Sequence, residues 1–204
     1  MDYGTMSDKP KFQRDDALKV AKEMCEQLSP WCEERPLEKP WIIVAGSLRR
    51  RKELVGDVEI LYVPQMKMEK PDGDWFATDV AVDQVSRRLD VLISHGIIKK
   101  RLTVMGSETW GPKNKLAVHV ASGIPVDLFL ATKENWFNYL ICRTGSAENN
   151  VAIASAAKAK GWGWNPYGNG FSRPSGLGNE ERVITSEREV FEFVGLPYKE
   201  PWER

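Results

Sequence analysis

Residues 44–60 of the chain read VAGSLRRRKELVGDVEI. It combines a Gly-Ser turn after a short apolar run, three consecutive arginines, and two carboxylates spaced one residue apart. A turn that follows a strand can present backbone N–H groups to an anion, and arginine forks match phosphate oxygens. The stretch therefore predicts two strands joined by an anion-binding turn.

Three carboxylates are candidates for a metal site. Asp57 and Glu59 alternate along an expected strand, so their side chains leave the same face. Alternating acids also fit a solvated strand face, but Gly56 before them lets the backbone approach a ligand. Asp127 lies in an apolar run, IPVDLFL at 124–130, where a charge is costly to bury without a partner such as Mg²⁺. If the two strands are neighbours, the three carboxylates suit two-metal phosphoryl transfer.

Composition limits the class of protein. The chain has 204 residues, enough for one or two small domains, and its formal net charge is zero. A polyanion would therefore meet local basic clusters such as Arg49–Lys52 or Lys99–Arg101 rather than a basic surface. No apolar run approaches the roughly 18 to 20 residues of a membrane span. The start lacks a secretory pattern, and the three cysteines lack metal-ligand spacing, so we expect a cytoplasmic protein with reduced thiols.

The hydrophobic pattern predicts an α+β fold in two parts, residues 1–131 and 132–204. For the first part we expect, in chain order, a helix from Asp15 to near Pro30, strands at 41–46 and 57–64, a loop at 65–77, a helix from a Thr78 cap to Gly96, a strand at 101–106, and two strands joined by a two-residue turn at Ser122-Gly123. For the second part we expect a helix from Thr132 to Leu140, a helix from Ser146 to Gly161, an irregular stretch at 161–180, and a helix from Ser186 to Gly195.

At the level of motifs, GSLRRRKELVGDVEIL resembles the nucleotide-binding signature of the DNA polymerase X family, the polymerase-beta-like nucleotidyltransferases. That signature runs Gly-Ser, two residues, Arg, five residues, Gly-Asp-x-Asp. Every spacing is met, with Glu59 where the polymerases usually have Asp. Three later segments are similar to the family's third-ligand strand, its nucleotide-selecting helix and its C-terminal end: GIPVDLFLATKENW, LICRTGSAENNVAIASAAKAKGW and VFEFVGLPYKEPWER. The resemblance covers residues 14–204.

The resemblance implies a nucleotidyltransferase palm with a mixed sheet and flanking helices at 1–131, then a small, mainly helical, nucleotide-selecting lobe at 132–204. It implies metal-dependent transfer of a nucleoside monophosphate from an NTP or dNTP to a hydroxyl. The favoured acceptor is a DNA 3′ end in repair-type synthesis, with DNA preferred over RNA. The family's larger members carry a lyase domain and a DNA-binding helical domain before the Gly-Ser motif, and this chain resembles a short form without them.

The same resemblance assigns roles to residues. It makes Asp57, Glu59 and Asp127 the catalytic ligands of two Mg²⁺ ions, for which Mn²⁺ can substitute. The residues it implies for the triphosphate are Gly46, Ser47, Arg50 and Gly56. The residues it implies for sugar and base are Thr144, Gly145 and Asn150.

Two departures from the family pattern leave the reaction open. Cys142-Arg143 stands where the polymerases have an aromatic pair, and Arg143 can contact a nucleotide 2′-hydroxyl or phosphate, or point to solvent. Val151 and Ala154 replace basic residues expected on the following helix. Template-independent transfer to RNA, a protein or a small molecule is therefore an alternative, and a non-catalytic nucleotide-binding module is a third hypothesis.

Overall fold

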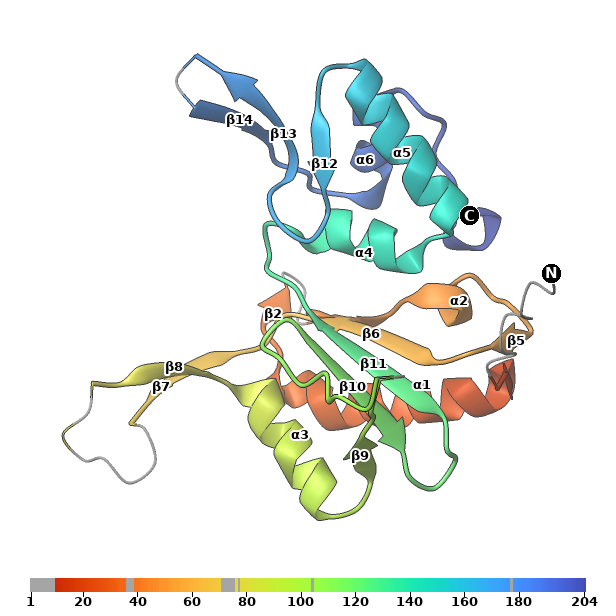
Figure 1. Cartoon of the computed structure of the whole chain (residues 1–204), viewed down its shortest axis with the longest axis vertical. Coiled ribbons are helices and arrows are strands. Elements are labelled where there is room, and N and C mark those ends of the chain that lie inside the picture. Colours follow the sequence, from red (N-terminus) through yellow and green to blue (C-terminus); the bar gives the residue numbers. More distant parts are fainter. Residues whose placement is uncertain (1–9, 36–38, 71–75, 77, 104, 177) are drawn as a thin grey trace.

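The computed structural model describes residues 10–35, 39–70, 76, 78–103, 105–176 and 178–204. It shows an α+β fold built on a mixed sheet, which confirms the predicted fold class (Figure 1). The elements up to residue 131 are β1 (Phe12–Gln13), α1 (Arg14–Leu28), η1 (Ser29–Trp31), β2 (Glu34–Arg35), β3 (Lys39–Pro40), β4 (Ile42–Val44), α2 (Gly46–Arg49), β5 (Leu54–Val55), β6 (Val58–Tyr62), β7 (Met66–Glu69), β8 (Val80–Asp83), α3 (Gln84–Ser94), β9 (Ile98–Lys100), β10 (Asn114–His119) and β11 (Pro125–Leu130). The later elements are α4 (Trp136–Thr144), α5 (Ala147–Ala159), β12 (Gly163–Asn165), β13 (Gly170–Ser175), β14 (Gly178–Arg182), α6 (Glu187–Val194) and η2 (Pro201–Glu203).

The central sheet has five strands in the order β4-β6-β11-β10-β9. β6 and β11 run parallel, and the other neighbouring pairs are antiparallel. Alternate residues of β6 and β11 point to opposite faces. Val58, Ile60 and Leu128 pack with α1 and α3 in one core cluster, whereas Leu61 and Phe129 pack with α4 in another. The residues that alternate with Val58, Ile60 and Leu128 along these strands therefore lie on the α4 side of the sheet.

The second part of the chain has its own core. Residues from α4, α5, β13 and α6 form a separate cluster that includes Ile141, Ile153, Phe171 and Phe191. In Figure 1, α4 lies between this lobe and the central sheet. Trp136, at the start of α4, packs against the sheet, so one helix contributes to both cores. The division into residues 1–131 and 132–204 stays a prediction.

Several helix ends agree with the sequence pattern. Ser146 and Ser186 cap α5 and α6 through hydrogen bonds from backbone N–H groups, and Gly195 ends α6 in the left-handed conformation. The helix expected from Thr132 begins later, at Trp136, and continues to Thr144. Thr132 instead accepts a hydrogen bond from the backbone N–H of Asn135 in the preceding turn.

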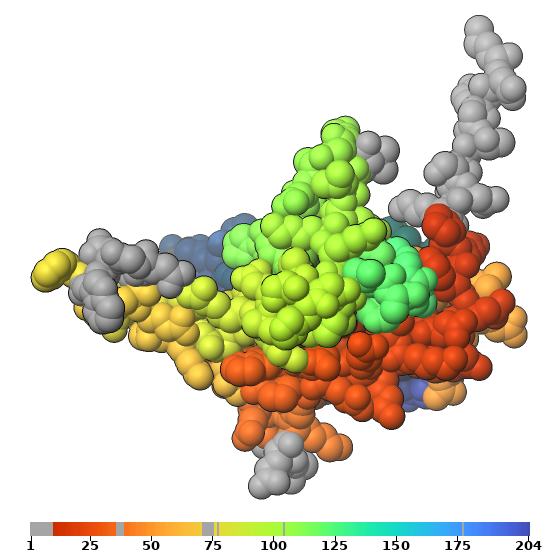
Figure 2. Space-filling view, turned by 90° about the horizontal axis from the view of Figure 1, so that it is seen from below, coloured from red at the N-terminus to blue at the C-terminus, as the bar shows by residue number. Residues whose placement is uncertain are grey.

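Five local predictions are wrong. The loop expected at 65–77 includes β7, which pairs with β8, and the helix expected from Thr78 begins at Gln84 with Asp83 as its cap. Figure 2 shows this β7–β8 ribbon projecting from the body. The strand expected at 101–106 lies earlier, as β9, and the turn between β10 and β11 is longer than two residues. The stretch expected to be irregular at 161–180 contains most of a three-stranded antiparallel sheet, β12-β13-β14.

Two features of the described residues bear on the cysteines and on membrane insertion. All three cysteines are free thiols. None of the helices among these residues has the length and apolar character needed to cross a membrane.

Candidate active site

The pairing of β6 with β11 brings the predicted carboxylates together. Glu59 and Asp127 are direct partners in the parallel ladder, and Asp57 lies two residues before Glu59 and therefore shares its face. Because Val58, Ile60 and Leu128 point into the core beneath α1 and α3, the acids lie on the α4 side. The sequence predicted this convergence only on the condition that the two strands were neighbours.

Burial and the repulsion of neighbouring carboxylates raise the pKa values of Glu59 and Asp127. Burial, followed by the nearby charge of Asp57, raises the pKa of Glu59 to about 7. Burial also raises the pKa of Asp127 to about 6, although the neighbouring Arg101 opposes the shift. Like charges that share a site raise each other's pKa values, and a cation relieves the repulsion. The site thus has the electrostatic character of a place for positive charge.

Arginine side chains supply positive charge to this face. Arg101, which follows β9, donates from Nη2 to Asp127 Oδ1 at 2.5 Å. Arg143, near the end of α4, has Nη1 3.9 Å from Glu59 Oε1 and its guanidinium 3.6 Å from the ring centroid of Phe129. Arg143 therefore lies against the site rather than in solvent. The role of Arg101 was missed in the sequence, because pairing between a residue after β9 and one in β11 is visible only in the folded sheet.

The chemistry of the acids fits a hard divalent cation, which prefers carboxylate oxygens. As the side chains stand, no group of three or more His, Cys, Asp or Glu residues in the described parts of the chain is arranged to hold a metal ion. The Mg²⁺ sites at Asp57, Glu59 and Asp127 therefore stay a prediction.

Gly46 permits a close approach between α2 and the acids. A Cβ atom at Gly46 would lie 2.0 Å from Glu59 Oε2, and the backbone there has a φ of +64°. The positive φ favours glycine, and any other side chain would also displace the carboxylate of Glu59. The backbone is tied to the same strand, since Ala45 N–H donates to the Glu59 carbonyl at 2.8 Å. Ser47 is half-buried on α2, and Gly56 is exposed just before β6.

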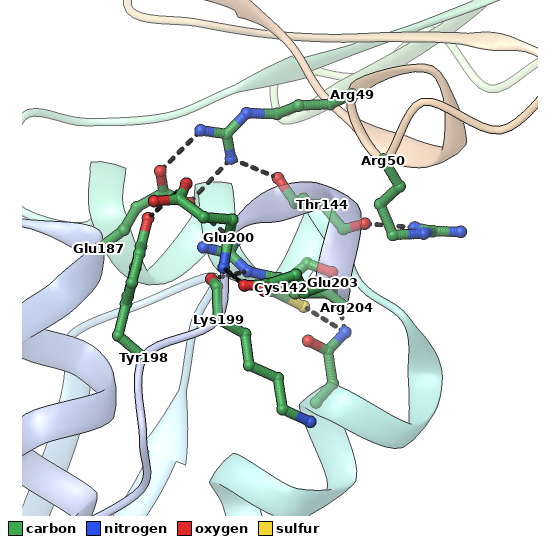
Figure 3. Close-up of polar contacts among 11 residues, drawn as sticks. Arg49, Arg50, Cys142, Thr144, Glu187, Tyr198, Lys199, Glu200, Glu203 and Arg204 are labelled. Atoms are coloured by element: carbon green, nitrogen blue, oxygen red, sulfur yellow. Dashed lines mark hydrogen bonds and ion pairs between the residues drawn. The ribbon is translucent and has the colours of Figure 1, made fainter.

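Arg49, the last residue of α2, and Arg50, which follows it, both reach the end of α4. Arg49 donates from Nη1 to Thr144 Oγ1 at 2.8 Å, and Arg50 donates from Nη1 to the Thr144 carbonyl (Figure 3). Gly145 then lets the chain turn beside Arg50, because a Cβ there would lie 3.0 Å from Arg50 Nη1. The predicted residues Arg50, Thr144 and Gly145 are therefore neighbours.

Asn150 lies behind this turn on α5. Its Nδ2 donates to the carbonyl of Cys142 at 2.8 Å. Its Oδ1 is buried without a hydrogen-bond partner among the described residues. A buried acceptor of this kind is costly unless a ligand or water satisfies it. Asn150 thus both supports the turn and offers an acceptor at the position expected to contact a nucleotide.

A buried ion cluster connects α2 to the C-terminal lobe. Arg49 makes two hydrogen bonds to Glu187, at 2.8 and 2.6 Å, and Arg204 donates to the same carboxylate at 2.8 Å (Figure 3). Burial raises the pKa of Glu187, but the hydrogen bonds from Arg49 and the arginine charges outweigh it, so the pKa lies below its usual value. No local pattern signals this cluster, because 138 residues separate Arg49 from Glu187.

Comparison with known proteins bears on the C-terminal lobe. Residues 139–204 match the family model of the DNA polymerase beta thumb. The match includes Thr144, Gly145 and Asn150, and it supports a polymerase-beta-like relationship at a coarse level. The three carboxylates lie outside the matched segment. A search of curated proteins found no match.

We expect Gly46→Ala to destabilise the protein by about 1–3 kcal/mol, because alanine is strained at positive φ and its Cβ collides with Glu59. Gly56→Ala is the matched control, since nothing lies within 4 Å of a Cβ at that position. Its effect should stay within about 1 kcal/mol. Urea denaturation of the three proteins measures both. Equal stability of the two variants would contradict the packing described for Gly46.

We expect Glu187→Gln to cost about 3–5 kcal/mol, because Arg49 and Arg204 would be left buried without their carboxylate. Glu180→Gln removes a carboxylate from the exposed pair that it forms with Arg173 and should change stability by less than about 1 kcal/mol. Thermal or chemical unfolding compares the two variants. A small effect at Glu187 would show that the cluster does not hold the lobe to α2.

Proposed function

We propose that the chain is a metal-dependent nucleotidyltransferase that transfers a nucleoside monophosphate from an NTP or dNTP to a hydroxyl group. The observation that carries the proposal is the placement of Glu59 opposite Asp127 on one sheet face, with Asp57 beside them. The arginines of α2 and the turn at Thr144 border that face. This arrangement combines places for cations with donors for phosphate oxygens.

The residues proposed to hold two Mg²⁺ or Mn²⁺ ions are Asp57, Glu59 and Asp127. When bound, such ions supply charge neutralisation to phosphate oxygens and lower the pKa of an attacking hydroxyl. The raised pKa values of Glu59 and Asp127 fit this role, because carboxylates crowded together favour a cation. We assign Asp127 to the side of the attacking hydroxyl, as the family resemblance implies.

The remaining residues bind and orient the nucleotide. Arg50 has several N–H donors in a planar fork, and with Ser47 and the backbone at Gly46 and Gly56 it is proposed to hold the triphosphate. Arg49 is committed to Glu187 and Thr144, so it fixes α2 rather than binding phosphate.

Sugar and base are assigned to the turn between α4 and α5. We place them beside Thr144, Gly145 and the buried acceptor of Asn150. Arg143 lies between Phe129 and Glu59, close enough to the acids to interact with a bound sugar or phosphate.

The preferred acceptor is a DNA 3′ end in repair-type synthesis. The match of residues 139–204 to a DNA polymerase thumb supports an interaction with DNA. The free thiols fit a reducing compartment, and we propose a cytoplasmic enzyme.

Template-independent transfer to RNA, a protein or a small molecule is the second candidate. The exposed surface of α5 favours it, because Val151 is 64% exposed and Ala154 is exposed, and neither can contact a template phosphate with a charge.

The decisive test is Asp127→Asn. We expect nucleotide transfer to a DNA primer to fall by at least about a hundredfold, because a catalytic carboxylate is lost, while stability changes little. Asp90→Asn, on the exposed surface of α3, is the control and should keep full activity. Primer extension with and without a template strand measures both transfer and template dependence. Near-normal transfer by Asp127→Asn would refute the assignment.

A further inference from the structure

A cavity of about 450 Å³ lies next to the candidate active site but outside the set of residues assigned to the nucleotide. Its walls come from the end of β11, the start of α4, the turn between β12 and β13, and the end of β14. In Figure 1 the end of β11, the start of α4 and the turn between β12 and β13 lie on the same side of the molecule as β13 and β14. The volume falls within the range of small-molecule sites.

Two tyrosines form an aromatic wall of the cavity. The rings of Tyr139 and Tyr167 meet edge to face, with centroids 5.1 Å apart and an interplanar angle of 89°. Tyr167 is held at both ends: its carbonyl accepts a hydrogen bond from Asn135 at 3.4 Å, and its hydroxyl accepts one from the Cys142 thiol at 3.2 Å. The residue is nevertheless 47% exposed. A fixed, exposed aromatic ring is suited to stacking against a planar group.

The rest of the lining provides both apolar and charged side chains. Leu130 and Val183 add apolar surface, while Lys113 and Arg182 contribute cations. Arg182 also donates from Nη2 to Glu189 Oε1 at 2.7 Å, and its side chain stays half exposed. Glu134 and Glu181 also border the cavity, so its charge is balanced. A lone anion gains little in such a site. A flat group with polar edges fits the interior, and phosphates attached to it can contact the two cations.

The cavity is linked to the acids through a single side chain. Tyr167 and Tyr139 lie with their ring centroids 5.2 and 5.5 Å from the guanidinium of Arg143. The same guanidinium stacks on Phe129 and approaches Glu59. The side chain of Arg143 would therefore lie between a group stacked on Tyr167 and the carboxylates.

We propose that this cavity binds one unpaired nucleobase of a nucleic-acid strand, stacked on Tyr167, with the adjoining phosphates on Lys113 and Arg182. The inference rests on the proposed function in one respect, namely that the chain acts on a nucleic acid. It adds a base-binding site separate from the place assigned to the incoming nucleotide. Such a site would hold a strand without the basic residues that Val151 and Ala154 replace on α5.

The test is binding of a short single-stranded DNA oligonucleotide that carries one 2-aminopurine, measured by fluorescence without divalent cations or triphosphate. Wild-type protein should quench the probe, and Tyr167→Leu should weaken binding roughly 5- to 150-fold through lost stacking. Tyr167→Phe keeps the ring and should bind within about twofold of wild type. Trp202→Leu is the matched control, because Trp202 has the same 47% exposure outside the cavity and should not change binding.

A second oligonucleotide separates base binding from phosphate binding. With an abasic site in place of 2-aminopurine, wild-type protein should bind as weakly as Tyr167→Leu binds the intact probe. Val183→Met lengthens an exposed lining side chain without touching the core, and it should weaken binding of the base-containing probe alone. Equal affinity for the two oligonucleotides, or unchanged binding by both Tyr167→Leu and Val183→Met, would overturn the proposal.

This titration, combined with the nucleotide-transfer assay on the same wild-type protein, distinguishes this proposal from the proposed function. Intact base-dependent quenching in a wild-type protein that transfers no nucleotide would reject the transferase activity and leave the cavity assignment in place. Nucleotide transfer by a wild-type protein that shows no base-dependent binding would reject the cavity assignment alone.

Discussion

The parallel pairing of β6 with β11 is the constraint on which the rest of the site depends. It sets Glu59 opposite Asp127 and assigns each face of the two strands. Residues on one face enter the core under α1 and α3, so the intervening acids must emerge on the other. A shift of one residue in this register would bury the acids in an apolar core and expose Val58 and Ile60. The hydrophobic requirement of the sheet therefore fixes the position of the polar chemistry.

The short helix α2 connects this sheet face to the C-terminal lobe. Its first residue, Gly46, has a positive φ and lies so close to Glu59 that any side chain there would displace the Glu59 carboxylate. Its arginines have different partners: Arg49 binds Glu187 in a buried cluster, whereas Arg50 binds the backbone of Thr144. Adjacent residues of a helix point in different directions, so α2 can contact the lobe at two places. The turn at Thr144 is thereby held beside the acids from the side of the central sheet as well as by its own helix.

The sequence could predict features that depend on local pattern and could not predict those that depend on distant pairing. Alternation located the strand that carries Glu59, and an apolar run beside a turn located the strand that carries Asp127. The serine caps and terminal glycine located the ends of α5 and α6. The β12–β14 sheet was missed because glycines and prolines interrupt any alternation and few aliphatic residues mark its strands. Arg101 and Glu187 were missed for a different reason. A single charged residue carries no sign of its partner, and both partners are distant in the chain.

The zero net charge of the chain conceals a local balance at the site. The acids at Asp57, Glu59 and Asp127 face arginines from three elements or their ends: Arg50 on α2, Arg101 after β9 and Arg143 on α4. Such a face is nearly neutral as it stands. Two divalent cations and one triphosphate carry nearly opposite total charges. Binding of both together would therefore leave the net charge of this face nearly unchanged, whereas binding of either one alone would change it. Under the proposed function, this face is therefore better matched to a metal–nucleotide complex than to a free cation or a free anion, and the partial burial of its acids increases that difference.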